Sequence, residues 1–229
     1  MQENFLIMGM ARTGSTYLWS LLKTHPSIDC FNDDLCEEFK KNNLPLRVFL
    51  NSKFNNISKK IGTKILPNFY DEFTTEDFIW LKEVKNFKKA IYIYRENVLD
   101  QYVSLQLAQL NNAFTSYQLK NEIVGIYKSQ SIKIEPKKLL HWHEYYKQTN
   151  IKIMETIKAI FGNYVSIEYN ELKNQRKLKT IYSYLNVPYI HTESKQIKQK
   201  TKTNKEIIEN YQELKTELTG TELEAYFND

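Results

Sequence analysis

Short apolar segments alternate with amphipathic ones along the chain. Compact apolar or aromatic runs, of the length of buried strands, occur at residues 5–10, 61–66, 90–94 and 164–169. Between them, apolar side chains recur at helical spacing at residues 15–24, 74–84, 97–112 and 136–161. Strands that alternate with helices predict an α/β fold in which helices cover both faces of a mostly parallel central sheet.

No repeat and no domain boundary interrupts this pattern, so residues 1–229 are expected to form a single domain. Residues 192–205 contain five lysines and are the best candidate for a mobile segment.

Nowhere do about 18 apolar residues follow one another, so no membrane span is expected. The two cysteines, Cys30 and Cys36, are too few for a disulfide framework or a four-ligand zinc site, which favours a reduced, cytoplasmic setting.

The charge balance limits the class of partner. The 32 basic residues exceed the 27 acidic ones by only five, and the two kinds are interspersed. A nucleic-acid-binding surface needs a stronger basic bias, so no nucleic-acid partner is expected. A small polyanionic ligand is compatible with this charge.

The first apolar run ends in the segment Gly9-Met-Ala-Arg-Thr-Gly-Ser-Thr16, here called the glycine loop. A strand, a glycine loop and a helix form a P-loop, in which backbone N–H groups converge on an anion. Ser15 stands where a nucleoside triphosphatase has its phosphate-binding lysine. Arg12 offers a planar guanidinium instead, which binds phosphate or phosphosulfate bidentately. We therefore expect a P-loop-like three-layer fold and no metal; the alternative is a loop that merely turns the chain.

Two segments resemble the sulfotransferase superfamily, particularly the bacterial carbohydrate sulfotransferases. Arg-Thr-Gly-Ser-Thr at 12–16 matches the family's donor-binding loop, and Tyr94-Arg-Glu-Asn-Val-Leu99 with Ser104 matches its second element. The resemblance implies that the donor is 3′-phosphoadenosine-5′-phosphosulfate (PAPS) and that Arg95 and Ser104 hold its 3′-phosphate. It assigns the rest of the donor site to Arg12, Thr13, Gly14, Ser15 and Thr16.

The position of Arg95 supports this assignment. It follows a predicted strand at its carboxyl end, the edge at which open α/β sheets bind ligands. Ser104 lies about two helical turns further on and is able to face the same anion. The alternative is a surface ion pair of Arg95 with Glu96 or Asp100.

Weaker matches extend the resemblance over most of the chain. They are Gly62-Thr-Lys-Ile-Leu66, Tyr169–Leu172, Tyr184–Val187, Asn210–Leu214 and Thr219–Thr221. If the strand that carries Lys64 ends near the glycine loop, Lys64 and Arg12 are suited to stabilise charge on the departing 5′-phosphate oxygen. The lysine-rich segment, residues 192–205, corresponds to the family's C-terminal motif that closes over the nucleotide. Lys200 is the residue of this segment that is expected to bind the donor.

An attacking hydroxyl needs a proton acceptor. The resemblance places a glutamate eight residues after a His-Pro pair, and this count leads from His25 to Asp33. Asp34 and Glu37 stay open as alternatives, as does a solvated acidic turn. His141 and His143 are two residues apart on a predicted helix and point to different faces, so we expect structural or surface roles for both.

The predicted function is transfer of the sulfuryl group from PAPS to an acceptor hydroxyl of a carbohydrate or small metabolite. Its catalytic residues are expected to be Asp33, Lys64 and Arg12. One alternative is a P-loop nucleotide or nucleoside kinase, and another is a catalytically inactive nucleotide-binding module. The sequence does not identify the acceptor or the oligomeric state.

Overall fold

The structure, a computed structural model, describes residues 3–31, 39, 44–54, 59–66, 73–112, 130–191, 193–194 and 202–227. The chain forms two compact units. The first unit comprises Met1–Tyr94 and Thr149–Lys195, and the second comprises Arg95–Gln148 and Gln196–Asp229.

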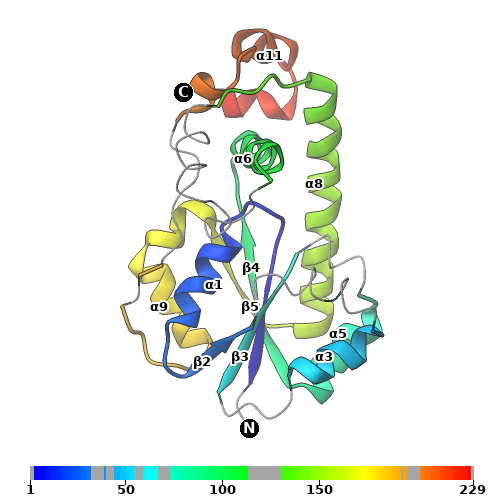
Figure 1. The fold of residues 1–229 in the computed structure, drawn as a ribbon, viewed down its shortest axis with the longest axis vertical. Helices are drawn as coiled ribbons and strands as arrows, with labels where there is room; N and C mark the ends of the chain where they lie inside the picture. Colours follow the sequence, from blue (N-terminus) through cyan, green and yellow to red (C-terminus); the bar gives the residue numbers. More distant parts are fainter. Residues whose placement is uncertain are drawn as a thin grey trace. The chain divides into compact units, whose positions relative to one another are not determined.

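The first unit is built around a parallel sheet (Figure 1). Its strands in the described residues are β1 (Asn4–Met8), β2 (Ile28–Cys30), β3 (Lys60–Ile65), β4 (Phe87–Tyr94) and β5 (Tyr164–Glu168). Their order across the sheet is β2-β3-β1-β4-β5, and every pair of neighbours is parallel. The central strand β1 is buried along its whole length, as the apolar run that follows Asn4 predicts.

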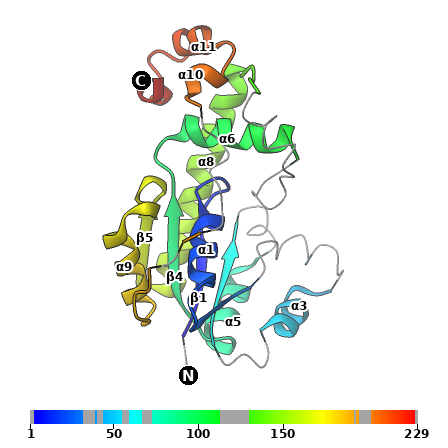
Figure 2. The ribbon, with the colours of Figure 1, turned by 60° about the vertical axis from the view of Figure 1, so that its left-hand side comes forward.

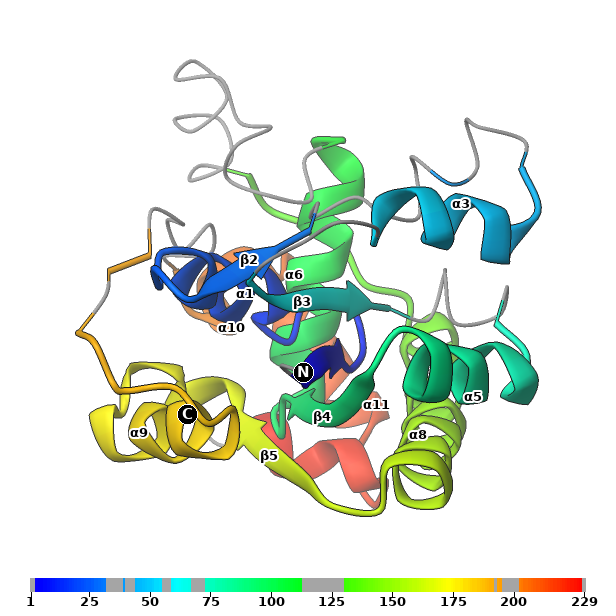
Figure 3. The same cartoon turned by 90° about the horizontal axis from the view of Figure 1, so that it is seen from below.

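Helices cover both faces of this sheet, as Figure 3 shows from below. One face is covered by α1 (Ser15–Lys23) and α9 (Gln175–Tyr184), whose apolar side chains form one core with β1, β4 and β5. Against the other face pack α5 (Thr75–Val84) and η1 (Ile157–Phe161), a π-helical turn. The unit also contains α3 (Leu46–Lys53) and η2 (Tyr169–Lys173). The three-layer α/β fold expected from the sequence is confirmed.

The predicted strands are all present, with shifted ends. The strand expected at 90–94 begins earlier, at Phe87. Its first part was not predicted because the charged side chains of Lys88 and Lys89 interrupt the apolar pattern. Lys88 pairs with Glu83, and Lys89 pairs with Glu3. The helix expected at 136–161 is α8 (Pro136–Thr156) followed by η1, and Gly162 with φ 69° follows it.

The second unit is helical in its described part. It contains α6 (Val98–Leu110), the first part of α8, α10 (Asn204–Ile207), α11 (Tyr211–Glu217) and η3 (Glu222–Phe227), a 3-10 helix. Apolar residues of α6, α8 and the C-terminal helices form a second core. The end of the lysine-rich segment belongs to α10, whose first turn is closed by a capping box between Thr203 and Glu206.

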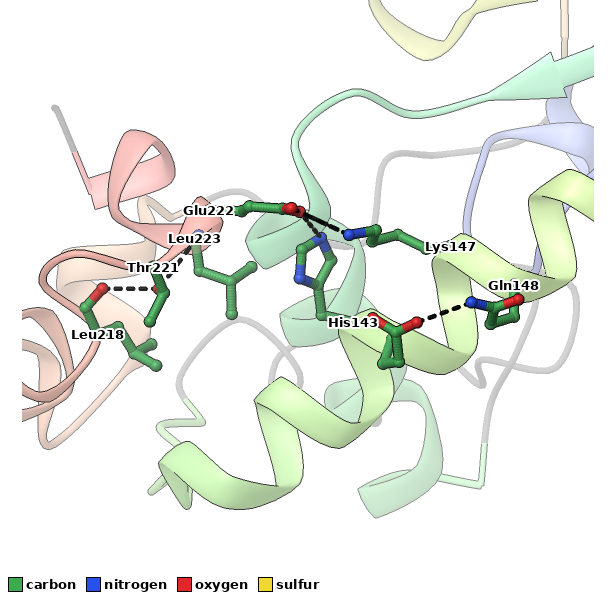
Figure 4. Close-up of polar contacts among 8 residues, drawn as sticks. His143, Lys147, Gln148, Leu218, Thr221, Glu222 and Leu223 are labelled. Carbon is green, nitrogen blue, oxygen red and sulfur yellow. Dashed lines mark hydrogen bonds and ion pairs between the residues drawn. The ribbon is translucent and has the colours of Figure 1, made fainter.

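Polar contacts attach η3 to α8 (Figure 4). Lys147 donates to both carboxylate oxygens of Glu222 at 3.0 Å, and His143 Nε2 lies 3.7 Å from Glu222 Oε2. Burial lowers the pKa of His143, although the charge of Glu222 acts in the opposite direction. His143 therefore has a structural contact, as expected, while His141 is exposed. In the described ranges, no helix is both long enough and apolar enough to cross a membrane.

Candidate functional site

The glycine loop connects β1 to α1 by a tight turn, visible in blue in Figure 2. Arg12 has φ 65° and Gly14 has φ 85°, so two residues of the turn adopt the left-handed conformation. Such turns create a concave row of backbone N–H groups that binds anions. Gly14 occupies the N-cap of α1 and has no side chain to accept hydrogen bonds from the first helical N–H groups. The loop therefore has the backbone geometry of an anion site.

Both glycines of the loop are required by their surroundings. A Cβ atom on Gly9 would lie 2.1 Å from the backbone oxygen of Ile93 on β4. At Gly14 it would lie 2.4 Å from Leu172 Cδ1 and 2.9 Å from Tyr169 Cδ2, in addition to the strain of the positive φ. The Tyr169–Leu172 segment, one of the weaker sequence matches, thus packs directly against the loop.

Lys64 lies next to the glycine loop. Its Nζ donates to Thr16 Oγ1 at 2.7 Å, and the lysine is only 6% exposed. The two residues meet because β3 pairs with β1 in parallel, so the carboxyl end of β3 lies beside the strand that leads into the loop. Lys64 therefore lies where the sequence analysis required it, and its catalytic role stays a prediction.

The remaining loop side chains differ in what they offer a ligand. Thr13 is fully buried and its hydroxyl donates to the backbone oxygen of Met10 at 2.8 Å. This hydroxyl therefore closes the turn. Ser15 is buried, whereas Arg12 and Thr16 are partly exposed.

Arg95 belongs to the second unit and follows directly on the last residue of β4. It is 4% exposed, and its Nη2 donates to Asp100 Oδ2 at 2.7 Å. Its backbone oxygen accepts a hydrogen bond from the hydroxyl of Tyr146 at 2.9 Å. The ion pair considered from the sequence is present, but it involves a buried arginine and not a surface one.

Ser104 lies on the face of α6 that carries Asp100. The two residues are four positions apart, which places their side chains next to each other on an α-helix. Ser104 is 6% exposed. Since Asp100 contacts the Arg95 guanidinium, Ser104 belongs to the same side of the helix as that guanidinium. Asp100 and Tyr146 thus both contact Arg95. The sequence indicated Asp100 as a possible ion-pair partner of Arg95 but gave no sign of Tyr146.

Several predicted residues lie outside the described part of the chain. They are Asp33, its alternatives Asp34 and Glu37, and Lys200. Phe31, two residues before Asp33, is described, and its backbone N–H donates to the oxygen of Gly62 at 2.9 Å, at the carboxyl end of β2. Parallel strands share their carboxyl edge, so the chain leaves β2 at the same sheet edge as it leaves β1.

Metal ligands do not cluster in the described residues, in which no group of three histidine, cysteine, aspartate or glutamate side chains is arranged to hold an ion.

The aromatic residue Trp142 lies between Tyr102 and Tyr146, with ring centroids 5.2 and 5.5 Å away, and packs against the second core.

Comparison with known proteins supports the fold. No family model and no curated protein sequence matches the chain. Among solved structures, the chain is similar to a sulfotransferase from Alicyclobacillus acidocaldarius, with a TM-score of 0.54 and 14% sequence identity over 99% of each chain. At this identity the likeness concerns the fold, and the chain thus shares its α/β fold with a bacterial sulfotransferase over almost its whole length.

Proposed function

We propose that this protein is a sulfotransferase that transfers the sulfuryl group of PAPS to an acceptor hydroxyl. The main support is the contact of Lys64 with Thr16: a buried lysine from β3 lies at a glycine loop that has serine in place of the P-loop lysine. The fold shared with a bacterial sulfotransferase and the loop sequence Arg-Thr-Gly-Ser-Thr point to the same chemistry.

The glycine loop would bind the 5′-phosphosulfate. Its N–H groups and the N-terminus of α1 favour negative charge, and Arg12 and Lys64 add two cations. Charge builds up on the bridging phosphate oxygen as its bond to sulfur breaks. Fixed positive groups at that oxygen stabilise the transition state more than the ground state, which is the condition for catalysis.

Arg95 and Ser104 would bind the 3′-phosphate. A guanidinium and a hydroxyl donate hydrogen bonds to phosphate oxygens, and the charged donor makes them stronger than neutral ones. The lysine-rich segment would contribute Lys200 to the same phosphate.

In the proposed reaction, the acceptor oxygen attacks sulfur and a new oxygen–sulfur bond forms. The bond from sulfur to the 5′-phosphate oxygen breaks, and its electron pair stays on adenosine 3′,5′-bisphosphate (PAP). The hydroxyl proton passes to a carboxylate, for which Asp33 is our first candidate and Asp34 and Glu37 are the alternatives. The acceptor would be a carbohydrate or small metabolite, the reaction would need no metal, and the protein would act in the cytoplasm.

Calorimetric titration tests the proposal directly. In EDTA, we expect PAP to bind at least about tenfold more tightly than ADP, because only PAP carries a 3′-phosphate for Arg95. Arg95→Ala should remove this preference. Arg176→Ala, which removes an exposed arginine on α9, should keep it.

Transfer of radiolabelled sulfate from PAPS to a panel of hydroxyl compounds in EDTA should identify the acceptor class. Equal or tighter binding of ADP, together with Mg²⁺-dependent ATP turnover, would instead establish the kinase alternative. Tight binding of PAP without transfer to any compound of the panel would favour a nucleotide-binding module.

A further inference from the structure

Arg95 is held at both ends. Asp100 accepts a hydrogen bond from its guanidinium at 2.7 Å, and Tyr146 donates one to its backbone oxygen at 2.9 Å. The side chain of Arg95 is 5% exposed, whereas that of Asp100 is 27% exposed. An arginine this far out of water needs a partner charge, and a carboxylate at hydrogen-bond distance supplies it.

The position of Asp100 is fixed by the start of α6. Asn97 is the N-cap, and its Oδ1 accepts from the backbone N–H of Asp100 at 2.8 Å. This bond defines the first turn of the helix and thereby the direction in which the carboxylate of Asp100 leaves it. Asp100 also lies in the helical turn where the macrodipole favours negative charge. The capped first turn therefore fixes the backbone of Asp100 beside the guanidinium that its carboxylate contacts.

Tyr146 is fixed from the other side. Its ring stacks on Trp142 with an interplanar angle of 28°, and Trp142 in turn contacts Tyr102 of α6 at 5.2 Å. The hydroxyl of Tyr146 is thus directed to the Arg95 oxygen by ring packing between α8 and α6. The backbone from which the arginine side chain starts is therefore held as well as its charged end.

A carboxylate partner does not prevent anion binding by the same arginine. A guanidinium has five N–H donors in one plane, enough for a carboxylate and a phosphate together. The phosphate then meets a side chain whose rotamers are already restricted, so binding costs less conformational entropy. Ser104, one turn after Asp100 on the same face of α6, offers a hydroxyl on that side of the helix.

We propose that Asp100 and Tyr146 are positioning residues that orient Arg95 for the 3′-phosphate and so make the protein selective for adenosine nucleotides that carry one. The inference rests on the proposed function of the protein. The selectivity for a 3′-phosphate would thus depend on the contacts that orient Arg95 as well as on its positive charge.

The test compares the affinities of PAP and AMP, which differ only in the 3′-phosphate, by calorimetric titration of the full chain. Asp100→Ala should lower the PAP-to-AMP preference at least about tenfold, with AMP affinity unchanged. Asp100→Asn, which keeps an oxygen acceptor of the same shape but removes the charge, should lower the preference less than Asp100→Ala does. Tyr146→Phe should lower it about threefold, because one neutral hydrogen bond is lost.

Matched controls remove similar groups elsewhere in the second unit. Glu135→Ala breaks an exposed ion pair with Lys138, and Tyr145→Phe removes the hydroxyl of a tyrosine that is 45% exposed. Neither should change the preference. If Asp100→Ala does not fold, Asp100→Asn and Tyr146→Phe still give the comparison.

The outcomes separate this inference from the proposed function. If the unaltered protein binds PAP no better than AMP, the proposed function fails and the inference with it. If it prefers PAP and Asp100→Ala or Tyr146→Phe keeps or increases that preference, only the inference is overturned. Equal loss of PAP and AMP affinity would also overturn it, because that pattern indicates a general structural role.

Discussion

The glycine loop and the Arg95 group, which consists of Arg95, Asp100, Ser104 and Tyr146, are held in place in different ways. The loop depends on its backbone: Gly9 and Gly14 lie where a Cβ atom would collide, and Gly14 has φ 85°. The Arg95 group depends on side chains, since a carboxylate and a phenol hold one arginine. Under the proposed function, the glycine loop would carry the chemistry and the Arg95 group would provide the selectivity.

Lys64 offers the strongest test of this division. Lys64→Met should lower kcat for PAPS turnover about a hundredfold, since one preorganised group at the leaving oxygen is lost. The affinity for PAPS should change far less, because the lysine acts mainly on charge that develops in the transition state. Formation of PAP from PAPS, with the acceptor or with water, provides the rate.

Lys60 is a matched control on the same strand. It is also buried, but lies at the opposite end of β3, where its Nζ donates to the backbone oxygen of Glu3. Lys60→Met should leave kcat unchanged. Equal kcat losses in the two variants, or a Lys64→Met effect confined to KM, would contradict a catalytic role for the loop lysine.

Gly9 tests whether the loop is fixed by its backbone. Gly9→Ala places a methyl group 2.1 Å from the Ile93 oxygen, and a strand backbone does not move away at low cost. We expect the free energy of unfolding to fall by at least about 2 kcal/mol, as in overpacked cores, and PAP affinity to fall with it. Urea denaturation and titration measure the two effects.

Gly162 is the comparison for this substitution. It has φ 69° and ψ −69°, and apart from its chain neighbours no atom lies within 4 Å of the place that a Cβ would take, so Gly162→Ala should cost only the strain of its backbone, about 1–3 kcal/mol. PAP affinity should not change. A Gly9→Ala variant that keeps the stability and the PAP affinity of the native protein would show that the approach of the loop to β4 is not a constraint.

Asp77 is a structural counterpart of Asp100, and its substitution should have a smaller effect that is limited to stability. Both are third residues of their helices and both accept from an arginine, but Asp77 pairs with Arg47 at 2.8 Å and closes a capping box with Thr74. Burial alone would raise the pKa of Asp77, but hydrogen bonds from Arg47 and Thr74 outweigh it and lower the pKa. Asp77→Asn should cost about 1 kcal/mol at neutral pH, without any change in PAP preference.

The pH dependence of this difference has a definite sign. A carboxyl whose folded pKa is depressed stabilises the protein above its unfolded pKa, about 3.9 for aspartate, and this contribution is lost as the pH falls through the lower folded value. The gap between the native protein and Asp77→Asn should therefore close below about pH 4. A gap that stays constant from pH 7 to about 3 in urea denaturation would exclude this linkage.

The parts of the structure that depend on residues close together in the sequence could be predicted. The apolar runs located β1, β3 and β5 to within a residue or two, while Lys88 and Lys89 hid the start of β4. The three residues of β2 are too few to produce a periodic pattern, and no strand was predicted there. The position of Arg95 at the carboxyl end of a strand was also predictable, because it follows an apolar run directly.

By itself, the sequence determined the three-layer α/β class, the glycine loop and the positions of Arg12 and Arg95 next to predicted strands. Each of these depends only on adjacent residues or on local periodicity. Only the tertiary structure decided that Lys64 reaches Thr16, 48 positions away, and that Tyr146 holds Arg95, 51 positions away. It also decided that Asp100 points to the arginine. Such contacts arise from strand pairing and helix packing, which bring distant residues together and leave no mark in the local sequence.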